Sequence, residues 1–329
     1  MPMTDSSAIA VVIPCYRVRD QILPLLASIG PEVGWIYVVD DACPQQSGEH
    51  VRRHCQDPRV QVITHAQNKG VGGAVVSGYR AAQASAAKVV VKLDGDGQMD
   101  PLDIPRVCGS LLAGHADYAK GNRFHRIGFV RGMPWVRLLG NAVLTLLTKL
   151  SSGYWQIADP TNGYTALRRE LIEELELERV AYRYFFETDL LYYLNQARAR
   201  VIDVPMRARY QDEPSSLRPH KVALPFLAGH ARNTLRRIAY SYFLRGFSLA
   251  SLQLLAGTLL LMLGGAFGIQ QWHLSLQTGV PATAGTVMLA ALPIIVGIQM
   301  LFSWLNFDVA NEPAHPVHPL LRQRQSASG

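Results

Sequence analysis

Charged residues are missing from one long stretch of this 329-residue sequence. Residues 246–307 contain no Asp, Glu, Lys or Arg, and residues 214–307 contain no Asp or Glu. A long helix of a soluble protein carries a charged face, so a hairpin buried in a globular core is a poor interpretation of this stretch. The stretch instead predicts segments that lie in a membrane.

Cysteine is also scarce, and its pattern excludes further classes of protein. The four cysteines contain no CxxC pair and no framework spacing, so neither a disulfide scaffold nor a standard zinc site is expected. Their use fits a reducing compartment such as the cytosol. The stretch MPMTDSSAIA lacks a basic region followed by a long apolar run, so no signal peptide is predicted.

Basic residues are in excess only in the last third of the chain. Residues 1–213 contain 24 Lys and Arg against 23 Asp and Glu, whereas residues 214–329 contain 8 against 2. Most of the net charge of +7 therefore lies beside the apolar stretch. This arrangement indicates contact with anionic lipid, and no nucleic acid partner is predicted.

Two apolar blocks within the uncharged stretch are long enough to cross a membrane. They cover about Phe247–Ile269 and Ala284–Leu305, and a helix of either length spans a hydrocarbon core of roughly 30 Å. Arginines precede the first block and follow the second, so both ends are expected in the cytoplasm and the loop around Trp272 outside. We therefore expect an integral protein of the cytoplasmic membrane, with a two-helix hairpin over residues 246–307 and a cytoplasmic tail over residues 308–329.

Residues 214–245 form a basic juxtamembrane segment next to the first block. Arg232 and Arg236 are one helical turn apart, while Leu235, Ile238 and Tyr242 share another face. This pattern is typical of an amphipathic helix in the lipid headgroup region. A linker helix that packs on protein has a similar apolar stripe, so this alternative stays open.

The first 213 residues alternate between strand-like and helix-like runs. Short, β-branched apolar runs predict buried strands at Ile9–Ile13, Trp35–Val39, Val60–Thr64 and Lys88–Leu93. Helices are predicted between them, around Gln21–Ile29, Ser47–Cys55 and Gly73–Ala84. The order predicts an α/β domain with a doubly wound, mostly parallel sheet, whose ligands bind beyond the carboxyl ends of the strands.

The stretch LDGDGQMDP at residues 93–101 brings three carboxylates together, Asp94, Asp96 and Asp100. Like charges this close repel each other, so the cluster is either a solvated turn or a cation site. An EF-hand is excluded because its sixth and twelfth positions are Met99 and Pro105 instead of Gly and Glu. The stretch follows a predicted strand, and this position favours a cation site.

A glycine-containing stretch, NKGVGGA at residues 68–74, resembles part of a dinucleotide-binding fingerprint. It follows the third predicted strand instead of the first, and Val75 stands where a small residue is needed. A nicotinamide dehydrogenase is therefore disfavoured. The glycines are expected to let a helix start close to a bound ligand.

Taken together, these motifs resemble family 2 glycosyltransferases with the GT-A fold. In chain order the matching stretches are IPCY (13–16), VVDDAC (38–43), NKGVGGA (68–74), LDGDGQMDP (93–101), DPTNGYTALRRE (159–170), FFETDLLYYL (185–194) and VIDVPMRARY (201–210). The two apolar blocks resemble the polyprenyl-phosphate branch, which includes dolichol-phosphate mannosyltransferases and bacterial undecaprenyl-phosphate glucosyltransferases. Processive polysaccharide synthases of the family carry a QxxRW motif, which this sequence lacks.

The resemblance implies a nucleotide-diphosphate sugar as the donor substrate. Six residues match positions around the donor, namely Pro14, Tyr16, Asp40, Asp41, Lys69 and Asp94. The resemblance also implies that Mg²⁺ or Mn²⁺ binds the donor diphosphate through three residues, namely Asp94, Asp96 and Gln98. Hard oxygen ligands suit both ions and leave coordination positions for phosphate.

The resemblance further implies that the acceptor is a polyprenyl phosphate, such as undecaprenyl or dolichyl phosphate. Arg123, Arg131 and Arg137 match arginines that hold its phosphate, and a guanidinium fork suits phosphate. Arg123 and Arg137 belong to the implied catalytic set together with Asp96 and Asp159.

The chemical roles of three acidic residues stay open in the sequence. Asp159 either orients the sugar or acts as a base, and a helix or turn cap is the structural alternative. Glu187 and Asp189 match an acidic pair often found beside the reacting centre, although either can cap a helix.

The function expected from residues 1–213 is a metal-dependent, inverting sugar transfer to a polyprenyl phosphate at the cytoplasmic leaflet. One rival is transfer to another membrane lipid, such as a diacylglycerol. A second rival is a degenerate, membrane-anchored relative that binds partners. The sugar, the nucleotide and the oligomeric state are not set by the sequence, which leaves a homo-oligomer open.

Overall fold

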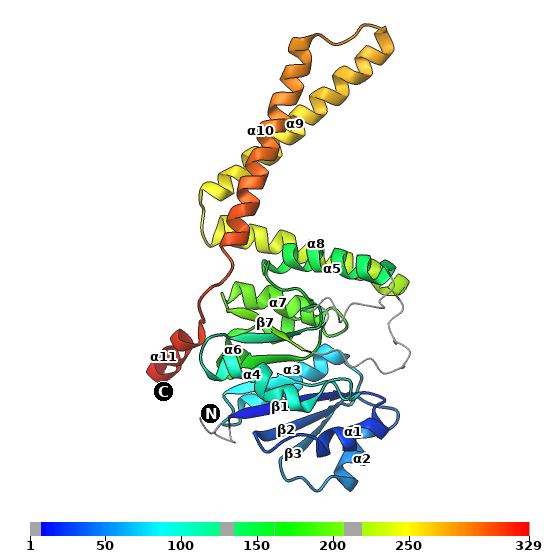
Figure 1. Ribbon diagram of the computed structural model, residues 1–329, viewed down its shortest axis with the longest axis vertical. Coiled ribbons are helices and arrows are strands. Elements are labelled where there is room, and N and C mark those ends of the chain that lie inside the picture. Colours follow the sequence, from blue (N-terminus) through cyan, green and yellow to red (C-terminus); the bar gives the residue numbers. More distant parts are fainter. Residues whose placement is uncertain (1–7, 126–134, 161, 207–218, 329) are drawn as a thin grey trace. The chain divides into compact units, whose positions relative to one another are not determined.

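The computed structural model describes residues 8–125, 135–160, 162–206 and 219–328 (Figure 1). The chain divides into two compact units. Unit 1 contains Met1–Thr234 and Pro313–Gly329, and unit 2 contains Leu235–Glu312. The long helix α8 (Pro219–Ile238) crosses the boundary between them.

Unit 1 is built on a seven-stranded mixed sheet of order β3-β2-β1-β4-β6-β5-β7. Its strands are β1 (Ile9–Cys15), β2 (Val33–Asp40), β3 (Val60–Thr64), β4 (Val89–Lys92), β5 (Tyr118–Asn122), β6 (Thr165–Arg168) and β7 (Val201–Pro205). The first four are parallel to one another, β6 is antiparallel to β4 and β5, and β7 is parallel to β5. The predicted α/β fold and its four predicted strands are confirmed, whereas β5, β6 and β7 were not predicted.

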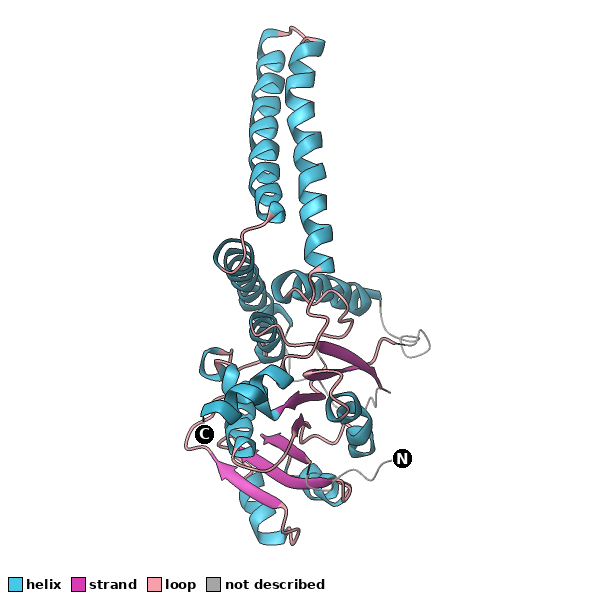
Figure 2. Cartoon of the chain, turned by 90° about the vertical axis from the view of Figure 1, so that its left-hand side faces the viewer, coloured by secondary structure: helices cyan, strands magenta, loops and turns pink. Residues whose placement is uncertain are grey.

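Helices pack beside this sheet, and the strands lie among them in Figure 2. Besides most of α8, unit 1 contains the α-helices α1 (Arg19–Ala27), α2 (Ser47–His54), α3 (Val71–Gln83), α4 (Ile104–Leu112), α5 (Trp135–Ser152), α6 (Arg169–Glu174), α7 (Phe186–Gln196) and α11 (His318–Ser328). Val12 and Val90 pack in one core with residues of α3 and α7, whereas Val11 and Val91 pack in a second core with residues of α1 and α4. The alternation is expected for strands buried on both faces.

Unit 2 contains a helical hairpin formed by α9 (Leu249–Thr278) and α10 (Ala284–Ala310). The prediction that Trp272 lies in the loop is wrong, because α9 continues past it and residues 279–283 form the link. Both helices are long and apolar enough to cross a membrane. A Cβ on Gly297 would lie 2.8 Å from the Gly257 carbonyl oxygen, and a Cβ on Gly264 would lie 2.9 Å from the Ala290 oxygen. The glycines therefore let the two backbones approach closely.

The base of the hairpin is tied by a buried ion pair. Arg237, near the end of α8, donates to both carboxylate oxygens of Asp308 at 2.6 and 3.0 Å. The hydroxyl of Tyr242 donates to the same carboxylate at 2.6 Å, and Ser251 donates to the Tyr242 carbonyl at 2.6 Å. Arg237 and Tyr242, which precede the first helix of the hairpin, therefore bind Asp308 near the end of the second helix. Asp308 is the first charged residue after the uncharged stretch.

The tail that follows the hairpin belongs to unit 1. Asp117, which is fully buried, accepts hydrogen bonds from the backbone amides of Val317 and His318 and from the His318 ring, at 2.7–3.1 Å. Helix α11 packs against α6, where Arg322 pairs with Glu170 at 2.5 Å. The part of the predicted tail that begins at Pro313 therefore belongs to unit 1, whereas residues 308–312 belong to unit 2.

Replacing Asp117 with Ala is expected to detach this tail. The change leaves three backbone amides and one imidazole without their buried acceptor, because the Arg200 amide also donates to Asp117. The expected cost is about 3–5 kcal/mol in the free energy of unfolding of unit 1. Thermal unfolding in detergent and the rate at which protease removes the tail would measure it.

Glu174→Ala is the matched control, because Glu174 contacts the same tail through an exposed pair with Arg324 at 3.2 Å. Such a pair contributes at most about 1 kcal/mol. Equal protease resistance of Asp117→Ala and the parent protein would show that the tail does not depend on Asp117.

Candidate active site

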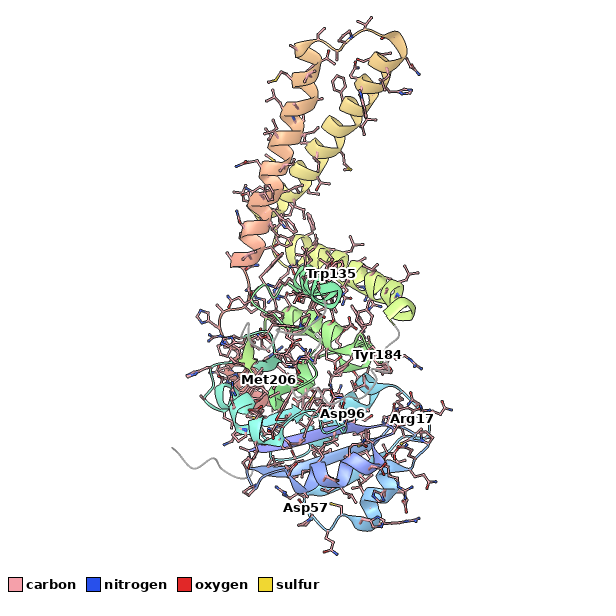
Figure 3. The ribbon with its side chains drawn as sticks, turned by 45° about the vertical axis from the view of Figure 1, so that its right-hand side comes forward. Arg17, Asp57, Asp96, Trp135, Tyr184 and Met206 are labelled. Atoms are coloured by element: carbon pink, nitrogen blue, oxygen red, sulfur yellow. The ribbon has the colours of Figure 1, made fainter. Side chains whose placement is uncertain are left out.

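The candidate site lies beyond the carboxyl ends of β1, β2 and β4, where the sequence placed it. The Asp41 amide donates to the Cys15 carbonyl at 3.1 Å, and the Arg17 amide donates to the Cys43 sulfur at 3.0 Å. The loops after β1 and β2 are therefore joined. Arg17 follows β1 and Asp96 follows β4. Because these two strands are parallel, both residues lie at the same edge of the sheet (Figure 3).

Asp40, predicted to contact the donor, organises the loop after β2. It is buried, and its two carboxylate oxygens accept hydrogen bonds from the backbone amides of Cys43 at 2.7 Å and Gly48 at 2.6 Å. Within that loop Ala42 and Gln46 adopt left-handed backbone angles, with φ of 52° and 53°. These angles are unfavourable for residues with a side chain, so Asp40 holds a strained loop in place. Its contact with the donor stays a prediction.

Asp41 organises the glycine-containing stretch that follows β3. Its carboxylate accepts from the backbone amides of Lys69 at 2.9 Å and Gly70 at 2.7 Å, and it pairs with the His65 ring at 2.7 Å. Gly70 has a φ of 86°, and a Cβ there would lie 2.5 Å from the Tyr182 carbonyl oxygen. Only glycine fits this turn, from which α3 begins.

Tyr16 and Lys69 are the members of the predicted donor set whose side chains reach solvent most freely. The Tyr16 side chain is exposed, and Lys69 is exposed on the turn held by Asp41. Pro14 is partly exposed at the end of β1, where a Cβ on Gly95 would lie 3.2 Å from its carbonyl oxygen. The loops that carry Pro14 and Asp94 are therefore in contact.

The carboxylates of LDGDGQMDP have different partners. Asp94 pairs with Lys92 at 2.8 Å, and Asp96 accepts a hydrogen bond from the Gln98 amide at 3.0 Å. Asp100, for which the sequence gave no role, accepts from the Leu102 amide at 3.1 Å and caps a short 3₁₀ helix. Asp100 is therefore explained as a cap, which leaves Asp94 and Asp96 for the ligand.

Three residues offer hard oxygen atoms to a divalent ion, namely Asp94, Asp96 and Gln98. Within the described parts of the chain, no group of three or more His, Cys, Asp or Glu could hold a metal ion by itself. Because Asp94 is also paired with Lys92, the protein supplies an incomplete ligand set. Such a set fits Mg²⁺ or Mn²⁺ that is bound jointly with phosphate oxygens of a substrate.

Arg123 and Asp159, predicted as phosphate ligand and catalytic residue, pair with each other. The Arg123 guanidinium donates to both Asp159 oxygens at 2.8 and 3.0 Å, and its backbone amide donates at 3.1 Å. Asp159 is fully buried, whereas 29% of the Arg123 side chain is exposed. The Arg123 side chain therefore reaches solvent from a fixed position beside a buried carboxylate.

Asp203 of β7 holds the two segments that carry this pair. One of its oxygens accepts from the Asn122 side chain at 2.9 Å and from the Ala158 amide at 2.8 Å. Burial raises the pKa of Asp203 to about 6. Asp203 lies in the matched stretch VIDVPMRARY, but its role has no local signal in the sequence, because its partners Asn122 and Ala158 are far away in the chain.

The other two predicted phosphate ligands are not placed as side chains. Arg131 lies outside the described residues, and Arg137 is located in the first turn of α5 by its backbone alone. Asp189, one of the acidic pair, accepts from the Ala181 amide and from the Asn233 side chain, both at 2.7 Å. It therefore joins α7 to α8 within unit 1.

Two buried lysines that contact residues of the candidate site were not predicted from the sequence. Lys92 contacts Asp94 and Glu187, and Lys120 of β5 donates to the Asn162 carbonyl oxygen in DPTNGY. Burial lowers the pKa of Lys120 to about 8. A lysine at the end of an apolar strand, as in VVVKLDGDG, was the available signal, because a buried ammonium needs a partner.

Known proteins resemble this chain in sequence and fold. The family model described as "Glycosyl transferase family 2" matches residues 10–176. Polyprenol monophosphomannose synthase of Mycolicibacterium smegmatis is 33% identical over 203 residues, which cover 60% of this chain and 75% of that protein. A UDP-N-acetylglucosamine–dolichyl-phosphate N-acetylglucosaminyltransferase of Methanococcus voltae is 30% identical over 154 residues, which cover 47% of this chain and 61% of that protein.

The fold is found again in a crystal structure of glucosyl-3-phosphoglycerate synthase from Mycobacterium tuberculosis with bound uridine diphosphate. The TM-score is 0.54 at 20% sequence identity, and the match covers 69% of this chain and 80% of that chain. At this identity the likeness concerns the fold.

Proposed function

Because the chain belongs to glycosyl transferase family 2 and is a glycosyltransferase, we propose that it transfers a sugar from a nucleotide-diphosphate donor to a polyprenyl phosphate. By their names, the two relatives described above act on a polyprenol and on dolichyl phosphate, and they transfer different sugars, mannose and N-acetylglucosamine. The family relationship therefore supports the class of acceptor more strongly than any one sugar.

The pairing of the acidic residues is the observation that carries this proposal. The three carboxylates that the sequence offered as bases are all bound: Asp159 to Arg123, Glu187 to Lys92, and Asp189 to Ala181 and Asn233. Although burial acts to raise it, nearby Lys92 and Lys120 hold the pKa of Glu187 below its ordinary value. A carboxylate in such a pair is a poor proton acceptor.

An acceptor that is already ionised needs no such base. The oxygen of a lipid phosphate is an anion at neutral pH, so it needs positioning beside the sugar instead of deprotonation. A diacylglycerol hydroxyl would need to lose its proton. The paired carboxylates therefore favour the phosphate, and the Arg123 guanidinium offers a charged fork that can bind it.

On the donor side, we assign the diphosphate to the loop that carries Asp96 and Gln98. A divalent ion bound there would neutralise negative charge on the departing nucleotide. The chain itself contributes the hydrogen bond between Gln98 and Asp96, and it fixes the neighbouring Asp94 through Lys92. The exposed Tyr16 and Lys69 are the side chains that we assign to the nucleotide.

Two observations support placement at a membrane, and the arginines that flank the hairpin favour its cytoplasmic face. The hairpin leaves unit 1 at Thr234 and rejoins it at Pro313, so both of its ends lie on the same side of a membrane that it crosses twice. In unit 1, apolar side chains are exposed on α5 and α8, namely Trp135, Leu138, Leu139, Val143, Leu146, Leu224 and Leu227. Exposed apolar groups beside a basic segment fit contact with lipid.

The test is a transfer assay with the full chain in membranes. Labelled UDP- and GDP-sugars would be supplied with undecaprenyl phosphate, with undecaprenol, or with diacylglycerol, in the presence or absence of EDTA. We expect a labelled lipid only with the phosphate acceptor, and its loss with EDTA. Transfer to undecaprenol or diacylglycerol at a similar rate would overturn the acceptor, and full activity in EDTA would overturn the metal.

A further inference from the structure

Lys92 occupies an unusual position for an ammonium group. It is the last residue of β4, in the middle of the sheet, where it lies opposite Val12 of β1 and Thr165 of β6. Alternation along β4 puts Lys92 on the same face as Val90, toward α3 and α7, and only 1% of its side chain is exposed. An ammonium buried this deeply is stable only when it is paired.

Two carboxylates from different segments provide that pairing. The Lys92 ammonium lies 2.8 Å from an oxygen of Asp94, in the loop after β4, and 2.9 Å from an oxygen of Glu187, in the first turn of α7. Asp94 is 30% exposed and Glu187 is 15% exposed, so Lys92 joins the edge of the site to the buried start of a helix. Both contacts are charge-assisted and directional.

A third segment closes over the same ammonium. A Cβ on Gly163 would lie 2.5 Å from the Lys92 nitrogen and 2.7 Å from an Asp94 oxygen. The DPTNGY loop therefore packs directly on the Lys92–Asp94 pair, and only glycine leaves room for it. One residue before, the Asn162 carbonyl accepts from Lys120. Lys92 thus lies where the Asp96 loop, the DPTNGY loop and α7 meet.

We propose that Lys92 is a positioning residue that fixes Asp94, and with it the Asp96 loop, against α7 and the DPTNGY loop. The proposal rests on the proposed function in assigning the donor diphosphate to the Asp96 loop. Without Lys92, the Asp94 charge would lie unpaired beside Asp96, and the two like charges would repel each other. Glu187 would also lose its partner. The loop would then no longer present Asp96 and Gln98 in a fixed arrangement.

The test replaces Lys92 with Met and compares it with a matched control. Arg168→Met is suitable because Arg168 is also buried, lies on the adjacent strand β6, and pairs with Glu170 at 3.1 Å. Arg168 is opposite Val89, at the other end of β4 from Lys92. Two further variants separate charge from position. Lys92→Arg keeps the cation, and Lys92→Met combined with Glu187→Gln removes the carboxylate that would be left unpaired in α7.

Two measurements on the full chain in detergent decide the proposal. Calorimetric titration with UDP and GDP in Mn²⁺ is expected to give a dissociation constant raised about tenfold or more in Lys92→Met and in the double variant. Arg168→Met is expected to stay within about threefold of the parent protein, and Lys92→Arg to recover part of the loss. Hydrogen exchange should be faster over residues 93–100 and 162–164 in both Lys92→Met variants, but not in Arg168→Met.

The proposal would be overturned if the double variant bound nucleotide as tightly as the parent protein and showed the same hydrogen exchange. Lys92 would then serve only to neutralise Glu187. Equal losses in Lys92→Met and Arg168→Met would overturn it too, because a general loss of stability would explain both. If the parent protein bound neither nucleotide, the proposed donor class would fail instead. Hydrogen exchange would then decide the positioning role by itself.

Discussion

Asp96→Asn is expected to lower sugar transfer by about a thousandfold or more, because it removes the carboxylate that we assign to the metal and the donor diphosphate. The amide keeps the shape of the side chain and can still accept the Gln98 hydrogen bond, so the loop is expected to keep its conformation. The loss is therefore electrostatic. Initial rates of labelled lipid formation against Mn²⁺ concentration would measure it.

Asp100→Asn is the control from the same loop. It removes one negative charge, but asparagine caps a helix as well as aspartate does, so the bond to the Leu102 amide is kept. We expect nearly parental activity and an unchanged metal requirement. If Asp96→Asn retained more than about a tenth of the activity at saturating Mn²⁺, Asp96 would not be a metal ligand of the reacting complex.

Arg123→Lys is expected to raise the KM for the lipid phosphate by about tenfold or more, with little change in affinity for a nucleoside diphosphate. The Arg123 guanidinium holds Asp159 through two nitrogens, and 29% of the Arg123 side chain is exposed. A lysine has one ammonium and cannot hold Asp159 and a phosphate in the same arrangement. Kinetics with varied undecaprenyl phosphate, and calorimetry with UDP or GDP, would separate the two effects.

Arg59→Lys is the matched control for this substitution. Arg59 also pairs with a carboxylate through several nitrogens, and its side chain is 26% exposed against 29% for Arg123. Its partner Asp57 lies near the lower end of the view in Figure 3, well away from Asp96. We expect kinetics like those of the parent protein. An unchanged KM in Arg123→Lys, or an equal loss of nucleotide affinity, would contradict an acceptor-binding role.

The sequence predicts those parts of the fold that have a local signal. The apolar runs of β1 to β4 alternate with helical segments, and the acidic cluster follows directly on one of these strands. The two long apolar helices also carry a local signal, because residues 246–307 contain no charged residue and provide two segments long enough to span a membrane. In both cases the pattern lies within one window of the chain.

The remaining strands lack that signal. β6 has only four residues, and one of them is Arg168. The Arg168 side chain can be buried because it pairs with Glu170 and donates a hydrogen bond to the Leu111 carbonyl oxygen. β5 contains Lys120, which is buried because it reaches the Asn162 carbonyl. A charged residue within four or five positions hides the period of a strand, and the partner that permits its burial is known only after folding.

The site was predicted residue by residue, but not its internal pairing. Arg123 and Asp159 were assigned to separate tasks, and their ion pair joins segments 36 positions apart. Lys92 and Glu187 are 95 positions apart. Single residues of a motif can be recognised from their type and order. Which of them neutralise one another depends on tertiary contacts that have no trace in local sequence.

The tail bound at Asp117 has a consequence for biosynthesis. Ribosomes make the chain from its amino terminus, so the segments that supply β1 to β7 emerge before the hairpin, whereas Val317 and His318 emerge after it. Until then, Asp117 lacks three of the four hydrogen-bond donors that contact it in the described parts of the chain, and the core lacks Leu321. Unit 1 therefore reaches its complete fold only after both apolar helices have been synthesised. Completion of the catalytic fold is thereby tied in time to the synthesis of the two apolar helices.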